Sequence, residues 1–342
     1  MNTLFEKADE KNIQYAGELL KQGEIVAIPT ETVYGIAADC TNQSAVEKIF
    51  IAKGRPQDNP LIVHIASLDM LEGVVSEFPV SAQKLAKAFW PGPLTLILPK
   101  GEKLCSATTA GLDSVGVRFP SHPVAQAVIQ AAGVPLSAPS ANVSGKPSPT
   151  TAQDVFLDMN GRLPLVLDGG ECNAGVESTV LSLLGEAPVL LRPGYVTKEQ
   201  IEKVLDVEVK VASAITEAVK SEEKVLSPGM KYKHYAPDAD LILVKGSLKA
   251  FASYVEGVSK DNAYCLCFDT EEERLPLPAL SYGKEGDGVS QAHHLFSKLR
   301  ELDKIGAKTV YVRCPDEEGV SLAVYNRLLR AAAFRVVDLP KE

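Results

Sequence analysis

Short apolar runs of strand length recur along this chain and are separated by helix-like segments. The runs at 24–29, 61–66 and 94–98 have the length of buried strands, and the segment 82–90 has the pattern of a helix. Pro91-Gly92-Pro93 ends that helix. Because strands and helices are mixed without strict alternation, the sequence predicts an α/β fold with a twisted sheet of mixed direction.

The pattern changes after about residue 211, and a length of 342 residues favours two domains. Residues 212–238 have little periodicity and contain Ser227-Pro228-Gly229 and His234-Tyr235-Ala236-Pro237. From residue 239, strands and helices alternate, which is typical of a smaller parallel three-layer, Rossmann-like domain. We therefore predict a first domain over 1–211, a linker over 212–238 that covers a ligand, and a second domain over 239–342.

The charge balance argues against a protein whose main function is to bind nucleic acid. The net charge is −9, of which residues 1–210 contribute −7. The N-terminus does not have the pattern of a signal peptide, and no run approaches the ~18 apolar residues of a membrane span. Six cysteines and five histidines lack metal-ligand spacing. We expect a cytoplasmic protein with no membrane segment and no built-in metal site.

Three polar segments follow predicted strands or helices, where α/β proteins place ligand-binding groups. In the first, residues 29–35, the hydroxyls of Thr30, Thr32 and Tyr34 alternate with other residues, so an extended segment would present them on one side. A threonine-rich strand end without any ligand would have the same composition.

The second segment places Lys53 and Arg55 two residues apart at a helix end, with Asn59 close behind. Cations at a helix C-terminus also interact favourably with the helix dipole, without any ligand. Because Gly54 and Pro56 stiffen the bend, we expect both cations to point at one anion.

The third segment, residues 137–142, is followed by Gly145-Lys146, but a phosphate loop of the Walker type would need a glycine at Ser140 and Ser/Thr at Pro147. Arg118 and Arg192 end predicted strands, and Arg118 could clamp a carboxylate. His64 lies in an apolar strand, where a histidine is usually a satisfied core residue. No Gly-x-Ser-x-Gly elbow points to a hydrolase.

Together with Glu177-Ser178-Thr179 and the two linker motifs, these segments resemble the YrdC-like family of threonylcarbamoyl-adenylate synthases in its two-domain form. The resemblance covers almost the whole chain. It implies a YrdC-like first domain that makes L-threonylcarbamoyl-AMP and pyrophosphate from L-threonine, bicarbonate or CO2, and ATP. Other proteins would then transfer the activated group to tRNA.

The resemblance also implies roles for individual residues. Lys53, Arg55 and Asn142 would be catalytic. The L-threonine site would comprise Thr32, His64, Arg118, Ala138 and Ser178. The ATP site, with Mg²⁺ carried by the nucleotide, would comprise Arg55, Asn59, Ser114, Ser140, Ser148, Arg192 and Tyr235.

Two other functions share part of this pattern. An RNA-binding regulatory protein without ATP turnover could use the same first domain, although the charge of −7 on residues 1–210 weighs against it. A carbamoyl-transfer module of hydrogenase maturation would need zinc-finger segments, and the chain has no Cys-x-x-Cys pair.

Overall fold

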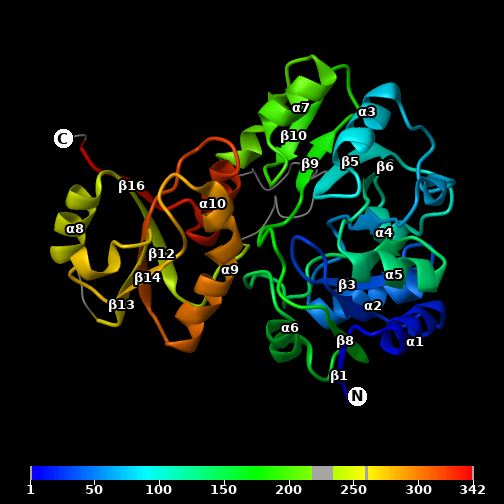
Figure 1. Ribbon diagram of the computed structural model, residues 1–342, viewed down its shortest axis with the longest axis horizontal. Coiled ribbons are helices and arrows are strands. Elements are labelled where there is room, and N and C mark those ends of the chain that lie inside the picture. Colours follow the sequence, from blue (N-terminus) through cyan, green and yellow to red (C-terminus); the bar gives the residue numbers. More distant parts are fainter. Residues whose placement is uncertain (1, 218–233, 259–260, 341–342) are drawn as a thin grey trace. The chain divides into compact units, whose positions relative to one another are not determined.

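The computed structural model describes residues 2–217, 234–258 and 261–340, and these form two compact units. The first contains residues 2–144 and 148–215, and the second contains 145–147 and the described residues from 216 onward. Each unit is built around its own sheet (Figure 1). The motif Ser227-Pro228-Gly229 lies outside the described residues.

The first unit contains a mixed sheet of eleven strands in the order β1-β8-β2-β3-β7-β4-β6-β5-β9-β10-β11. Parallel and antiparallel pairs alternate irregularly, since β4 pairs with β6 in parallel and β5 pairs with β6 antiparallel. The strands are β1 (Leu4–Lys7), β2 (Val26–Ile28), β3 (Gly35–Asp39), β4 (Ile62–His64), β5 (Leu94–Pro99), β6 (Ser114–Arg118), β7 (Leu136–Ser137), β8 (Leu165–Asp168), β9 (Thr179–Ser182), β10 (Val189–Arg192) and β11 (Lys210–Val211).

Helices pack on this sheet through apolar clusters. One cluster includes Ile49 and Phe50 of α2, and another includes Leu20 of α1 and Ile129 of α5. Full burial of such a side chain contributes about 1.5–3 kcal/mol. The helices are α1 (Glu10–Lys21), α2 (Gln43–Lys53), α3 (Val80–Phe89), α4 (Ser106–Thr109), α5 (Pro123–Ala132), α6 (Ala152–Met159) and α7 (Lys198–Leu205), with 3₁₀ turns η1 (Leu68–Leu71) and η2 (Ser213–Ile215).

The second unit is a parallel sheet of five strands in the order β14-β13-β15-β12-β16. Its strands are β12 (Asp240–Lys245), β13 (Ala263–Cys267), β14 (Ala279–Ser281), β15 (Thr309–Arg313) and β16 (Val336–Asp338). Its helices are α8 (Leu248–Glu256), α9 (Gly288–Lys304) and α10 (Ser321–Ala331), with the 3₁₀ turn η3 (Glu272–Arg274). This alternation confirms the predicted parallel α/β arrangement of the later half.

The predicted mixture of strands and helices is confirmed, but the form of residues 30–34 is not the expected one. Residues 31–33 form a bend instead of an extended segment. Thr30 Oγ1 donates to the Val33 carbonyl at 2.6 Å and lies 2.8 Å from Thr32 Oγ1. Side-chain hydrogen bonds of this kind compete with strand geometry. The hydroxyl of Tyr34 instead donates to the Gly170 carbonyl, at 2.7 Å.

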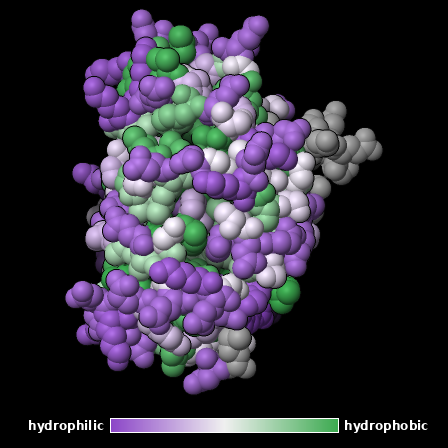
Figure 2. All heavy atoms as spheres, turned by 90° about the vertical axis from the view of Figure 1, so that its right-hand side faces the viewer, coloured by the Kyte–Doolittle hydropathy of each residue, from purple (hydrophilic) through white to green (hydrophobic). Residues whose placement is uncertain are grey.

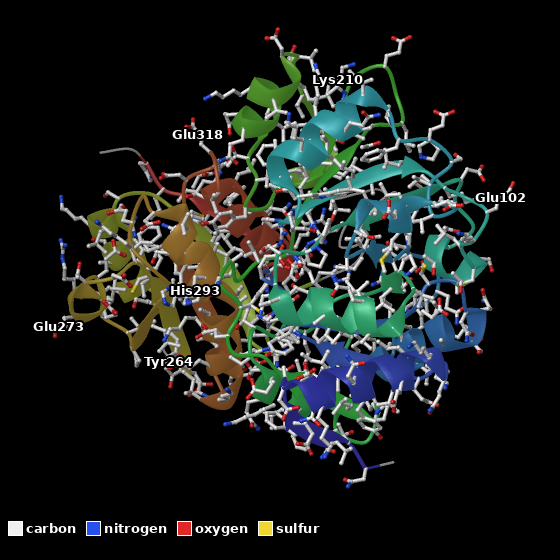
Figure 3. The ribbon with its side chains drawn as sticks, turned by 45° about the vertical axis from the view of Figure 1, so that its right-hand side comes forward. Glu102, Lys210, Tyr264, Glu273, His293 and Glu318 are labelled. Atoms are coloured by element: carbon white, nitrogen blue, oxygen red, sulfur yellow. The ribbon has the colours of Figure 1, made fainter. Side chains whose placement is uncertain are left out.

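The surface of the described residues carries both polar and apolar side chains. None of the helices in residues 2–217, 234–258 and 261–340 combines the length and hydropathy of a membrane span. On the face drawn in Figure 2, apolar residues form separate patches among polar ones. Charged residues such as Glu102, Glu273 and Glu318 lie at the periphery (Figure 3).

Helices α1 and α5 approach closely at Gly17. A Cβ atom at this position would lie 2.7 Å from the backbone carbon of Ala131, which is closer than real contacts allow. The helix tolerates the poor helix propensity of glycine because only glycine fits between the two backbones.

We expect Gly17→Ala to destabilise the protein by about 1–3 kcal/mol, although alanine is the better helix former. Urea unfolding of the variant measures this loss. Gln14→Ala, at an exposed position of the same helix, is the control and should change stability by less than about 0.5 kcal/mol. A more stable Gly17→Ala protein would show that the two helices can separate without loss.

Candidate active site

Three neighbouring strands place His64, Arg118 and Thr95 side by side. His64 of β4 is paired with Arg118 of β6, and Arg118 is paired with Thr95 of β5. Paired residues on adjacent strands direct their side chains to the same face of a sheet. All three side chains are buried. The sheet thus joins two residues assigned to the threonine site that are 54 positions apart in the chain.

Ser178 and Arg192 extend this row toward β9 and β10. Ser178 Oγ lies 2.8 Å from Thr95 Oγ1. Arg192 donates from Nε to the Ser178 carbonyl at 3.0 Å and from Nη2 to Ser178 Oγ at 3.2 Å. One residue assigned to threonine and one assigned to ATP are therefore in direct contact. Thr95 was not among the predicted site residues, because a threonine in an apolar strand gives no separate signal.

The His64 imidazole is kept neutral in this row. Burial, together with the nearby Arg118 guanidinium, lowers the pKa of His64 to about 3. Nδ1 lies 3.2 Å from the Ile62 carbonyl, which can only accept, so Nδ1 carries the proton. Nε2 is left as a hydrogen-bond acceptor inside the site.

Arg118 also meets a carboxylate that the sequence interpretation did not assign. Glu31 Oε1 lies 2.8 Å from Arg118 Nη2, and the two side chains are only 11% and 5% exposed. The groups are not aligned for a hydrogen bond, so both Glu31 oxygens and Arg118 Nε and Nη2 remain without hydrogen-bond partners. The sequence did contain a signal for Glu31, since it is an acidic residue between two threonines that follow a buried strand.

Lys53 is the last residue of α2, and Gly54 ends that helix in the left-handed conformation, with φ +61°. This turn is easy only for glycine. Lys53 Nζ donates to the carbonyl of Asn142 at 2.8 Å and to the carbonyl of Ser140. Ser140 Oγ in turn donates to Asn142 Oδ1 at 2.6 Å. The Lys53 ammonium group thus fixes the Ser-Ala-Pro-Ser-Ala-Asn loop of residues 137–142. The first and third predicted segments also meet, because Gly35 and Ser140 form an isolated β-bridge.

Arg55 and Asn59 lie together just beyond α2. Arg55 Nη2 donates to the Asn59 carbonyl at 3.2 Å. Asn59 is 1% exposed, yet neither its side-chain Nδ2 nor its Oδ1 has a hydrogen-bond partner. Buried amide groups are normally satisfied, so this one is suited to a polar ligand.

The remaining assigned residues occupy several elements. Thr32 and Ala138 are buried in the loops after β2 and β7. Ser114 begins β6, at the opposite end from Arg118. Ser148 Oγ donates to Glu177 Oε1. Among residues 2–217, 234–258 and 261–340, no group of three His, Cys, Asp or Glu side chains is arranged to hold a metal ion.

Tyr235 belongs to the second unit and is buried there. Its ring centroid lies 5.4 Å from that of Phe296, and the Arg327 guanidinium carbon lies 5.5 Å from the Tyr235 ring. The backbone of Tyr235 has a positive φ of 64°. Aromatic and cation–π contacts thus hold this residue, and its assignment to ATP stays a prediction.

Comparisons with known proteins decide the family. Residues 18–194 match the Sua5_yciO_yrdC family, described as "Telomere recombination", and residues 196–333 match Sua5_C, described as "Threonylcarbamoyl-AMP synthase, C-terminal domain". The chain is 43% identical over 341 residues to the threonylcarbamoyl-AMP synthase of Pyrococcus abyssi, with 98% of each chain covered. It belongs to the threonylcarbamoyl-AMP synthase family.

Other members of the threonylcarbamoyl-AMP synthase family agree with this placement. The Bacillus subtilis protein is 44% identical over 333 residues, which cover 96% of this chain and 95% of the relative. Pyrococcus abyssi Sua5 complexed with L-threonine superimposes with a TM-score of 0.88 at 41% identity, covering 99% of both chains. The family, the enzyme class and the fold class expected from the sequence are therefore confirmed, whereas the individual site residues remain predictions.

His64→Gln should make the free energy of unfolding less dependent on pH in the acidic range. Since the pKa of His64 is about 6.5 in an unfolded chain and about 3 when folded, the unfolded state binds more protons as the pH falls. The contribution of neutral His64 is complete above pH 6.5 and falls by about 1.4 kcal/mol per pH unit between pH 6.5 and 3. Urea unfolding from pH 7 to pH 4 should show a shallower slope for the variant.

Thr95→Val, a substitution on the same row without a titrating group, should keep the wild-type slope. Equal slopes for wild type and His64→Gln would contradict the assignment of a strongly lowered pKa to His64.

Proposed function

We propose that this chain makes L-threonylcarbamoyl-AMP and pyrophosphate from L-threonine, bicarbonate or CO2, and ATP. This reaction would be the first step of threonylcarbamoyladenosine formation in tRNA. The observation that carries the proposal is the close similarity to the Pyrococcus abyssi synthase over 98% of both chains. The unsatisfied polar groups of Arg118 and Asn59 support it, since they lie in the two substrate sites assigned from the sequence.

The threonine carboxylate would bind Arg118, whose planar guanidinium can hold two oxygens at once. Binding there also keeps the carboxylate away from the reacting amine. His64 Nε2 is available to accept a hydrogen bond from the threonine hydroxyl, because Nδ1 donates to the Ile62 carbonyl. Thr32, Ala138 and Ser178 complete the site that we assign to L-threonine.

In the first step, the threonine amine, in its neutral form, would attack CO2 and give a carbamate. In the second step, the carbamate oxygen would attack the α-phosphorus of ATP and displace pyrophosphate, so two anions must meet. Their repulsion is part of the barrier, and fixed positive charge reduces it. Lys53, Arg55 and Arg192 would supply this charge, together with Mg²⁺ that arrives bound to ATP. Correct alignment of the two reactants can itself lower a barrier by about 7–11 kcal/mol.

The other ATP contacts in this proposal are Asn59, Ser114, Ser140, Ser148 and Tyr235, and Asn142 joins the catalytic set. Tyr235 would exclude water that otherwise hydrolyses the product. The product would pass to separate threonylcarbamoyl-transfer proteins that act on tRNA in the cytoplasm.

Purified protein should release pyrophosphate from MgATP only when both L-threonine and bicarbonate are present. Chromatography with mass detection should identify threonylcarbamoyl-AMP in the same mixture. Reactions that lack one component serve as controls. Pyrophosphate release that does not depend on threonine would refute the proposal.

Lys53→Ala should lower the rate of synthesis at least about 100-fold, because it removes a positive charge and the donor that fixes the carbonyls of Ser140 and Asn142. Steady-state pyrophosphate release measures this loss, and circular dichroism checks the fold. Lys48→Ala, on the same helix but paired with Glu24 at the surface, is the matched control and should keep near-normal turnover. Similar rates for the two variants would remove Lys53 from the mechanism.

A further inference from the structure

Four unsatisfied polar atoms lie together where Glu31 meets Arg118. They are both carboxylate oxygens of Glu31, and Nε and Nη2 of Arg118. The charges are 2.8 Å apart and largely removed from water. A buried ion pair is favourable only if further hydrogen bonds satisfy the remaining donors and acceptors. This pair therefore has unused hydrogen-bonding capacity of both signs at a single place.

The loop that carries Glu31 is rigid, so the carboxylate is held in position. The Glu31 carbonyl accepts a hydrogen bond from the Ala174 amide at 2.8 Å. The side chain of Thr30 accepts from the amides of Thr32 and Val33, at 3.2 and 3.3 Å. A preorganised charged group of this kind is typical of a binding site.

Two further titratable groups near Glu31, His122 and Cys172, favour their uncharged forms at neutral pH. Burial lowers the pKa of His122, which favours the neutral imidazole at neutral pH. Burial raises the pKa of the Cys172 thiol, which therefore also stays uncharged. Of these neighbours, Arg118 is the one that carries a positive charge, and it is also the expected partner of the substrate carboxylate.

We propose that Glu31 binds the α-ammonium group of the amino-acid substrate while Arg118 turns its free donors to the α-carboxylate. This inference rests on the proposed function, in which the first substrate is L-threonine. In a zwitterionic amino acid the two charged groups are attached to one carbon, so the molecule fits between two opposite charges that are themselves in contact. One ion pair that lacks aligned hydrogen bonds is thereby replaced by two hydrogen-bonded ones.

The arrangement also explains how the site would select its substrate. A carboxylic acid without an amine would meet Arg118 but bring its negative charge beside Glu31. An amine without a carboxylate would compete with Arg118 for Glu31. Only a molecule with both groups satisfies all four protein atoms, so Glu31 and Arg118 together require a free α-amino acid. Glu31 would thus hold the nitrogen that later forms the carbamate.

Binding titrations without ATP or bicarbonate test this role. The ligands are L-threonine, 3-hydroxybutyrate, which lacks the ammonium group, and threoninol, which lacks the carboxylate. Glu31→Gln keeps the size of the side chain and removes its charge. We expect the variant to lose about 10- to 100-fold in affinity for L-threonine and for threoninol. Its affinity for 3-hydroxybutyrate should stay the same or increase, because Arg118 is freed.

Arg118→Gln should show the opposite selectivity, with weaker binding of L-threonine and 3-hydroxybutyrate. Its affinity for threoninol should stay the same or increase, because Glu31 is freed. Glu171→Gln, an equal charge change at an exposed neighbouring position, is the control and should bind all three ligands like wild type. If Glu31→Gln does not fold, Glu31→Asp keeps the charge and should show a smaller loss confined to the two ammonium ligands.

Equal losses for all three ligands, or no loss, would overturn the assignment of Glu31. Failure of the proposed function has a different result: the wild-type protein would bind L-threonine with this selectivity but release no threonine-dependent pyrophosphate. If wild type binds none of the three ligands, both the assignment and the proposed substrate are wrong.

Discussion

The pairing of β6 with β4 on one side and with β5 on the other determines the geometry of the candidate site. This register puts His64, Arg118 and Thr95 at one level of the sheet and on one face. A shift of one residue along β6 would turn Arg118 to the opposite face. The contacts of Ser178 and Glu31 with this row would then be lost, so backbone hydrogen bonding, and not any local motif, assembles the site.

The site contains polar groups whose burial is unfavourable for the protein alone. His64 stays neutral, while Glu31, Arg118 and Asn59 keep hydrogen-bonding groups without partners. Native proteins satisfy most buried polar groups, and exceptions gather where a ligand completes the structure. The substrates would therefore supply hydrogen bonds that the fold leaves open, and the rigid surroundings would lower the cost of binding them.

Much of this arrangement could be predicted from the sequence. The helix end at Lys53 and Gly54 followed from residue type, and the structure has it. The mixed sheet followed from short apolar runs separated by helices. The bend at 31–33 could not be foreseen, because the Thr30 side chain replaces backbone pairing there. Thr95 was missed because a threonine within a strand has no distinguishing neighbours in sequence.

The sequence by itself determined the fold class, the family and the residue types from which a site for an anionic substrate is made. Fold class, family and residue types depend on local propensities and on motifs of a few residues, and all of these involve residues that are close together in the sequence. Only the tertiary structure decided that Glu31 faces Arg118 and that Lys53 fixes the loop at Asn142. Those contacts join residues that are 87 and 89 positions apart in the sequence. Such residues come together only when the strands pair in their register and the helices bury their apolar faces.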